Sequence, residues 1–180
     1  MTEPLPLPPA AELVVKMVGV IGGEKEMDGI ACTPLVLDLV ESNLRQWDLE
    51  NTTRDPGATD AAVASAKREI DRLNIGRHHL VQEIDAAIDA ALDQSAEAQI
   101  ATESPGMVLD RLSVLVIRRA RTAFASSANP AYADRIVALE SQLAALCVAF
   151  DDFMDDLRAG KRRFFRYEHL KLYESDSHAD

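Results

Sequence analysis

Residues 59–91 read TDAAVASAKREIDRLNIGRHHLVQEIDAAIDAA and carry the longest regular apolar pattern in the chain. Apolar side chains recur in alternating steps of three and four residues, and Arg77 interrupts them. The apolar positions are Val63, Ala66, Ile70, Leu73, Leu80, Ile84, Ala87 and Ala91. This heptad spacing is typical of a helix that lies against other helices, and Thr59 can cap its first turn. The pattern therefore predicts a long helix that begins after Thr59 and continues to Ala91.

Three further helices are predicted from proline-containing starts followed by apolar repeats. Thr33 can cap a helix and Pro34 suits its first position, so a helix is expected over about residues 34–53. It should end before Pro56, which disfavours helical geometry in the residue that precedes it. The other two helices are Met107–Thr122, which follows Ser104-Pro105, and Tyr132–Leu157, which follows Asn129-Pro130 and precedes Gly160. The helix after Pro105 is apolar on most faces, so we expect it at the centre of the fold.

The chain of 180 residues fits one domain, and the patterns favour an all-α fold. Four long helices with short loops predict an antiparallel bundle. Residues 1–32 are expected to form a proline-rich arm and a short irregular segment, in which residues 13–21 could be a helix or an edge strand. The bundle should occupy residues 33–160. Residues 161–180 should form a basic, aromatic tail with a short helix.

Charge and cysteine content limit the classes of function. The net charge of −11 repels phosphate backbones and anionic lipids, so neither nucleic acid nor membrane is an expected partner. Cys32 and Cys147 have no disulfide-like spacing, which suits reduced thiols and a cytoplasmic location. No nucleotide-binding or nucleophile motif is visible, and we expect no cofactor or metal.

Arg77 is the most informative polar residue, because a lone guanidinium among apolar neighbours is unfavourable unless an anion meets it. Two interpretations remain open. In one, Arg77 and Asn74 line a polar pocket that binds a carboxylate, phosphate or sugar. In the other, Arg77 forms a buried ion pair with Asp110 or Glu83 that fixes the register of the helices.

Two other clusters could carry chemistry. His78 and His79 are adjacent and point in different directions on a helix, so His78 could be a general base or a surface residue. Asp151, Asp152 and Asp155 have the DDxxD spacing that holds magnesium against a diphosphate, although a solvated acidic face is the simpler reading. The cations and rings of the tail are expected to pack on the bundle and to neutralise these aspartates.

Several short motifs point to a known family. They are Asn43, Trp47, Glu50 and Arg54; Lys67–Asp71 with Asn74 and Arg77; the block TESPG-x3-DRLS at residues 102–113; and Tyr167, Lys171 and Tyr173. With these motifs the chain resembles an uncharacterised bacterial family, the domain of unknown function DUF4254, over about residues 33–175. Members often lie beside glycosyltransferase genes in cell-envelope clusters, which implies a link to sugars or activated sugars.

The chain departs from this family pattern at two places. Residues 74–79 read NIGRHH where the family tends to have N-Q-x-R-N-D, and residues 172–175 read LYES where it prefers Met-Tyr-Asn-Asp. These departures suggest altered pocket contents. The alanine-, arginine- and aspartate-rich composition would fit a paralogue recruited to a secondary-metabolite pathway.

Three hypotheses for the function follow. In the first, the bundle binds or transforms an anionic or sugar-like small molecule in a carbohydrate, cell-envelope or secondary-metabolite pathway. Trp47 would stack on a ring, and Glu103, Asp110 or His78 would transfer protons. The ligand-binding residues would be Asn43, Trp47, Asn74, Arg77 and Arg111. In the second, the protein is not an enzyme but forms a homodimer or docks a biosynthetic enzyme. The third is magnesium-dependent diphosphate chemistry at the DDxxD.

Overall fold

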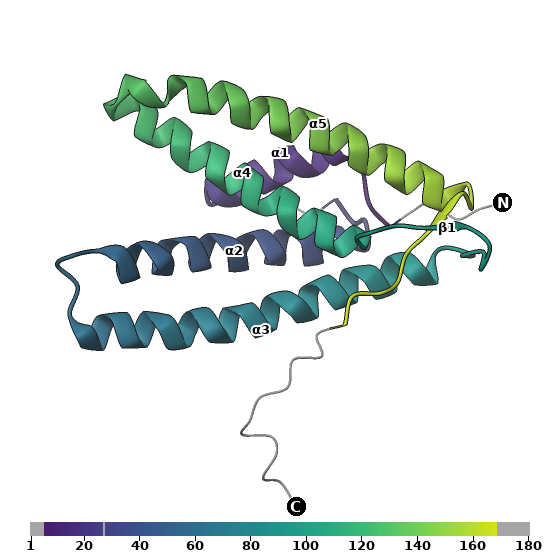
Figure 1. Cartoon of the computed structure of the whole chain (residues 1–180), viewed down its shortest axis with the longest axis horizontal. Coiled ribbons are helices and arrows are strands. Elements are labelled where there is room, and N and C mark those ends of the chain that lie inside the picture. Colours follow the sequence, from purple (N-terminus) through teal and green to yellow (C-terminus); the bar gives the residue numbers. More distant parts are fainter. Residues whose placement is uncertain (1–5, 27, 169–180) are drawn as a thin grey trace, which may run out of the picture.

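The computed structural model describes residues 6–26 and 28–168, and its architecture is all-α (Figure 1). In chain order its elements are α1 (Ala10–Ile21), α2 (Thr33–Arg54), α3 (Asp60–Ala90), β1 (Gln99–Ile100), α4 (Pro105–Ala128), a 3-10 turn (Pro130–Tyr132), α5 (Ala133–Arg158) and β2 (Arg162–Arg163). The four long helices predicted from the sequence are present, and each begins and ends near its predicted bounds except α4, which continues six residues beyond the predicted Thr122 to Ala128. Lys171 and Tyr173 lie outside the described residues.

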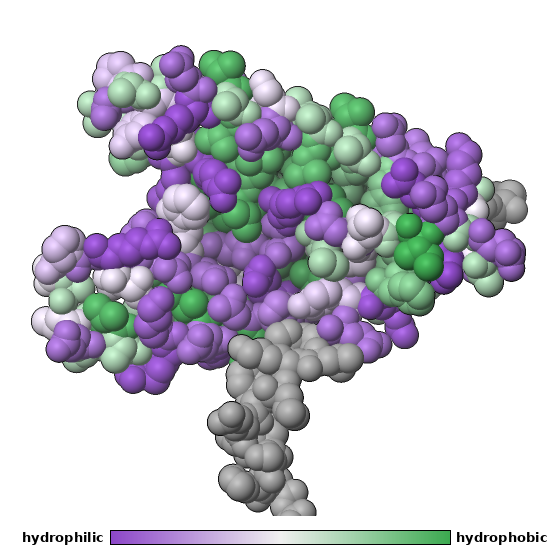
Figure 2. All heavy atoms as spheres, viewed as in Figure 1, coloured by the Kyte–Doolittle hydropathy of each residue, from purple (hydrophilic) through white to green (hydrophobic). Residues whose placement is uncertain are grey.

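The long helices form two antiparallel hairpins, α2 with α3 and α4 with α5. Helix α4 is central, as its apolar sequence predicts, because it packs against α1, α2, α3 and α5. Within the described part of the chain, α5 packs on α4 and α1 but not on α2 or α3. The two hairpins diverge toward their loops (Figure 1), and an indentation separates their ends on the molecular surface (Figure 2).

The helix starts follow the capping residues of the sequence. Thr59 accepts a hydrogen bond from the Ala62 N–H at 3.2 Å, and Ser104 accepts one from the Met107 N–H at 3.3 Å. Thr33 was expected to cap α2, and this is wrong. Its hydroxyl instead donates to the Asp28 carboxylate at 3.1 Å, because Thr33 is itself the first helical residue.

Helix α1 belongs to the core. Leu13 and Met17 are fully buried, and α1 packs on α2, α4 and α5. The sequence left a helix and an edge strand open for this segment, and the structure has the helix. The core cluster that contains these α1 side chains also takes side chains from every long helix, among them Val36, Val40, Ile84, Leu109, Leu112, Phe150 and Phe153. The N-terminal segment is therefore part of the packing between the two hairpins.

The described part of the tail is extended, so the expected short helix is wrong for residues 161–168. Gly160 adopts a φ of 67° after α5, and the chain then turns to pair β2 with β1 in parallel. The Ala101 N–H donates to the Arg163 carbonyl at 2.8 Å. Backbone pairing with a distant segment thus replaces a helix. Within residues 6–26 and 28–168, none of the helices combines the length and the apolar character needed to cross a bilayer.

Candidate functional site

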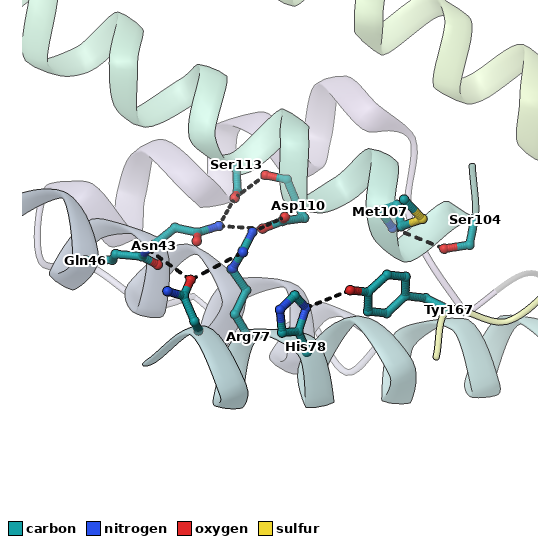
Figure 3. A network of polar contacts seen from close by, with 10 residues as sticks. Asn43, Gln46, Arg77, His78, Ser104, Met107, Asp110, Ser113 and Tyr167 are labelled. Atoms are coloured by element: carbon teal, nitrogen blue, oxygen red, sulfur yellow. Dashed lines mark hydrogen bonds and ion pairs between the residues drawn. The ribbon is translucent and has the colours of Figure 1, made fainter. Parts of the chain in front are cut away.

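A polar network joins α2, α3 and α4 (Figure 3). The Arg77 Nη1 atom of α3 donates to the Asp110 Oδ2 atom of α4 at 2.7 Å. The Asn43 side chain of α2 donates to the other oxygen of the same carboxylate at 2.8 Å. One carboxylate therefore accepts from two neighbouring helices. Of the two ion pairs left open for Arg77, the structure has the one with Asp110.

Asn43 and Ser113 form the buried side of the network. The Asn43 amide also donates to the Ser113 hydroxyl at 2.7 Å, and that hydroxyl donates to the Asp110 carbonyl at 2.8 Å. Both side chains are buried. Because buried amides and hydroxyls are stable only when they are hydrogen-bonded, this arrangement fixes the spacing of α2 and α4.

Arg77 and Asp110 are less buried, with 25% and 18% of their side chains exposed. The Arg77 Nη2 atom makes a long bond of 3.4 Å to the Asn74 oxygen, which also accepts from Gln46 at 3.0 Å. The Nε atom of Arg77 is buried and has no hydrogen-bond partner within the described residues. The guanidinium is thus held by Asp110 on one side while part of its donor capacity is unused.

Next to this network is a cavity of about 240 Å³. Its lining combines one aromatic ring, amides, ionised groups and two apolar side chains. These residues are Asn43, Gln46, Trp47, Glu50, Asn51, Arg54 and Arg77, with Val114 and Ile117 of α4. A concave site with an aromatic wall and a few convergent polar groups is the usual form of a small-molecule site.

The structure brings five of the predicted site residues together: Asn43, Trp47, Asn74, Arg77 and Asp110. It adds six lining residues that were not predicted as site residues: Gln46, Glu50, Asn51, Arg54, Val114 and Ile117. Glu50, Asn51 and Arg54 follow Trp47 by three, four and seven residues and so lie on its face of α2. That spacing was the available signal. It was not decisive, because polar residues at these positions also suit a solvated helix face.

Glu103 and Arg111 lie elsewhere. Their side chains pair with each other at 3.0 Å. Both line a smaller cavity of about 170 Å³, which is also lined by Phe150 and Phe153 of α5. They are therefore separated by α4 from the cavity that contains Trp47.

His78 contacts the C-terminal segment. Its Nδ1 atom is 3.0 Å from the Tyr167 hydroxyl, and the two rings stack with their centroids 5.5 Å apart (Figure 3). His78 follows Arg77 in α3, but it does not line the cavity beside Trp47.

The TESPG block has a structural explanation. The buried Asp85 carboxylate of α3 accepts from the Gly106 N–H at 2.7 Å and from the Tyr167 N–H at 2.9 Å. Desolvation raises the pKa of Asp85, and hydrogen bonds from Ser104 and these two amides only partly offset it. The carboxylate meets the otherwise unpaired donors at the start of α4, where negative charge is favourable.

Two aspartates of the DDxxD, Asp151 and Asp155, and the adjacent Asp156 contact other groups of the protein. Asp151 accepts from the Ala10 N–H at 2.9 Å, and Asp155 pairs with Arg158 at 2.9 Å. Asp156 pairs with Lys161 and Arg162, each at 3.4 Å. In the part of the chain that the structure describes, no group of three or more His, Cys, Asp or Glu side chains could hold a metal ion.

Comparisons with known proteins agree with the resemblance seen in the sequence. The chain matches the model of the family described as Protein of unknown function (DUF4254) over residues 33–165. No curated protein and no solved structure matches it. The match begins at α2 and ends in the segment after β2, so it includes the Asn43, Arg77 and Asp110 network and the TESPG block. Because this match covers most of its length, the chain belongs to the DUF4254 family.

Proposed function

We propose that the protein binds an anionic or sugar-like small molecule in the cavity between α2, α3 and α4. The observation that carries the proposal is the juxtaposition of Trp47 with an arginine, Arg77, whose donors are only partly used. An aromatic face can pack on the C–H face of a sugar ring, and a guanidinium can bind a carboxylate or phosphate. The amides of Gln46 and Asn51 can donate to and accept from hydroxyl groups.

The roles proposed for the network residues follow from their contacts. Asn43 and Asp110 would position Arg77, because their own polar groups are already engaged with protein. Asp110 remains the candidate for proton transfer nearest the cavity. Glu103 and Arg111 would act only at their own, separate cavity. The family resemblance makes a carbohydrate, cell-envelope or secondary-metabolite pathway the proposed setting.

The proposal is tested by thermal melting of the purified chain with a panel of neutral sugars, sugar acids, sugar phosphates, nucleotide sugars and acidic metabolites. A ligand that binds only the folded protein stabilises it by about 2.7 kcal/mol at one hundred times its Kd. For a chain of this size, that stabilisation raises the melting temperature by about 5–10 °C. We expect at least one compound of the panel to do so.

The matched variants are Trp47→Ala, which removes the aromatic wall, and Phe165→Ala, which removes an exposed ring that does not line the cavity. Trp47→Ala should abolish the ligand-dependent shift and Phe165→Ala should retain it. A panel without any shift in the wild type, or shifts that Trp47→Ala leaves intact, would contradict the proposal.

A second candidate function is a homodimer or a docking protein. It is supported by large apolar side chains that remain exposed on α1 and α5, with Val15 71%, Val137 65% and Val148 63% accessible. Exposed apolar side chains are typical of interaction sites where they gather into one contiguous patch. Multi-angle light scattering should then give the mass of a dimer, which Val148→Glu converts to a monomer. A monomeric wild type that recovers no partner from its native lysate would exclude this candidate.

A further inference from the structure

The charge of the cavity differs from that of the whole molecule. The chain carries a net charge of −11, yet the ionised groups that line the cavity are two arginines, Arg54 and Arg77, and one carboxylate, Glu50. Asp110 pairs with Arg77, so the two guanidinium groups meet two carboxylates and the cavity is close to neutral. In a protein of net charge −11, an anion is therefore repelled less here than elsewhere on the surface.

The two arginines differ in how freely they can meet a ligand. Arg54 lies at the exposed edge, with 74% of its side chain accessible, and contacts Glu50 at 3.3 Å. Glu50 also meets Lys67 at 3.8 Å, so the carboxylate keeps a cationic partner if Arg54 turns away. Exposed pairs of this kind contribute little to stability, and Arg54 can exchange its partner for a ligand at low cost.

Arg77 is held more firmly. Its contact with Asp110 fixes the plane of the guanidinium, while its Nε atom is buried and has no hydrogen-bond partner among the described residues. A guanidinium that is already oriented loses little side-chain entropy when it binds a planar anion. Arg77 is therefore the better anion partner, and Arg54 adds charge at the edge of the cavity.

The volume limits the part of a ligand that the cavity can hold. At about 240 Å³, the cavity is smaller than the range of about 300–1,000 Å³ that is usual for drug-sized ligands. It suits a single ring with its substituents, and it is too small to enclose a nucleotide sugar. Trp47 supplies a surface for that ring, and Gln46 and Asn51 can hydrogen-bond its hydroxyls.

We infer that the ligand of this cavity is an acidic monosaccharide, a single sugar ring that carries a carboxylate or a phosphate, with its anionic group on Arg77 and its ring on Trp47. This inference rests on the proposed function and names the class of ligand for the same site. The two acidic groups share the chemistry that a guanidinium recognises, and the experiment distinguishes them.

Trp47 makes the test direct, because it is the only tryptophan of the chain and its fluorescence reports on the cavity. The probes are glucuronate, glucose 6-phosphate, glucose and inorganic phosphate. We expect glucuronate or glucose 6-phosphate to change the fluorescence saturably, with an affinity at least about tenfold above those of glucose and inorganic phosphate. The better of the two acidic probes identifies the anionic group.

Three variants complete the design. Arg77→Lys keeps the positive charge beside Asp110 but loses the planar donors, and it should weaken binding of the acidic sugar about tenfold. Arg54→Gln should weaken it less, and the loss should shrink at high salt. Arg72→Gln is the matched control, since Arg72 is an exposed arginine of α3 that pairs with Glu69 outside the cavity. It should bind like the wild type.

Three other outcomes would each overturn the inference. Glucose that binds as tightly as the acidic probes would overturn this inference and leave the proposed function standing. Inorganic phosphate that binds as tightly would also overturn it, because the ring would then contribute nothing. No response to either acidic sugar would overturn it as well, and the melting panel would then decide the proposed function separately.

Discussion

Gly106 lies at a close approach of α3 and α4. A Cβ atom at this position would lie 2.7 Å from the Val81 carbonyl oxygen and 2.8 Å from the Asp85 Oδ1 atom. The first of these is backbone, so it cannot move without shifting α3. The glycine of the TESPG block is therefore explained by the contact between helices, and the Gly106 N–H that donates to Asp85 is part of the same contact.

Gly106→Ala should destabilise the protein by about 2–3 kcal/mol, because overpacking of a tight contact forces the backbone apart. Gly76→Ala is the matched control within a helix. A Cβ atom there would meet nothing within 4 Å, so the change should stabilise α3 by about 0.5–1 kcal/mol. Urea unfolding measures both. Equal effects of the two substitutions would contradict the close approach.

Asp85 should make stability depend on pH. Its pKa is raised in the folded protein by desolvation, so the folded form holds the proton more tightly than the unfolded chain does. The contribution of Asp85 is therefore fully present below its unfolded pKa and is lost as the pH rises through the raised folded pKa. The free energy of unfolding of the wild type, relative to Asp85→Asn, should fall as the pH rises from the unfolded pKa of Asp85 through its raised folded pKa.

Asp28 should make stability change with pH in the opposite direction. Although desolvation raises the pKa of Asp28, hydrogen bonds from the Ile30 N–H and Thr33 lower it more, and Lys16 adds to this. Relative to Asp28→Asn, the wild type should therefore gain stability as the pH rises through the low folded pKa of Asp28. Urea unfolding at several pH values gives the free energy of unfolding of the wild type relative to each of the two variants, Asp85→Asn and Asp28→Asn. If both differences changed with pH in the same direction, the opposite pKa shifts of Asp85 and Asp28 would be contradicted.

At the scale of elements, the segment after α5 acts as a strap on α3 and β1. β2 pairs with β1, the Phe164 N–H donates to Gln94 at 2.7 Å, and Tyr167 reaches Asp85 and His78. Phe164 is 4% exposed and Phe165 67% exposed, so only the first of these adjacent rings packs on the core.

Phe164→Ala should lower the free energy of unfolding by about 3 kcal/mol, since it empties a buried aromatic position. Phe165→Ala should change it by less than about 0.5 kcal/mol, as surface substitutions usually do. Chemical denaturation of the two variants provides the comparison. A Phe164→Ala variant as stable as Phe165→Ala would show that the strap does not pack in solution.

Among the secondary-structure elements, the helices could be predicted from the sequence and the pairing of the strands could not. Thr59, Ser104 and Gly160 have local signals, and the structure bears these out at α3, α4 and the end of α5. The pairing of β1 with β2 has no such signal, because two-residue strands show no alternation and each depends on a partner distant in the chain. Local patterns predict helices well and predict strand partners poorly.

The same limit applies to the candidate site. Arg77 was identified because a cation is unusual among apolar residues, and its partner Asp110 was one of the two carboxylates considered for it, because it interrupts the apolar helix after Pro105. Glu50 and Arg54 could not be assigned in this way, since an exposed helix face has the same composition. They line a cavity only because the two hairpins diverge, and divergence is a property of the packed molecule (Figure 1).

At the scale of the whole molecule, α4 connects the two hairpins and the network at Asp110 connects α4 to both helices of the first hairpin. Farther along α4, Arg121 pairs with Asp48 of α2 at 2.7 Å. Both pairs cross between the hairpins. Arg77 is thus a paired charge that ties α3 to α4 at the floor of the cavity.

The most direct test is a double-mutant cycle with Arg77→Met, Asp110→Asn and the double variant, read as free energies of unfolding in urea. Each single change should cost about 1–3 kcal/mol, because it leaves a partly buried charge without its partner. The double variant should cost less than the sum of the two, by at least about 1 kcal/mol. Additive effects, within about 0.5 kcal/mol, would show that the two side chains do not interact and would contradict the account.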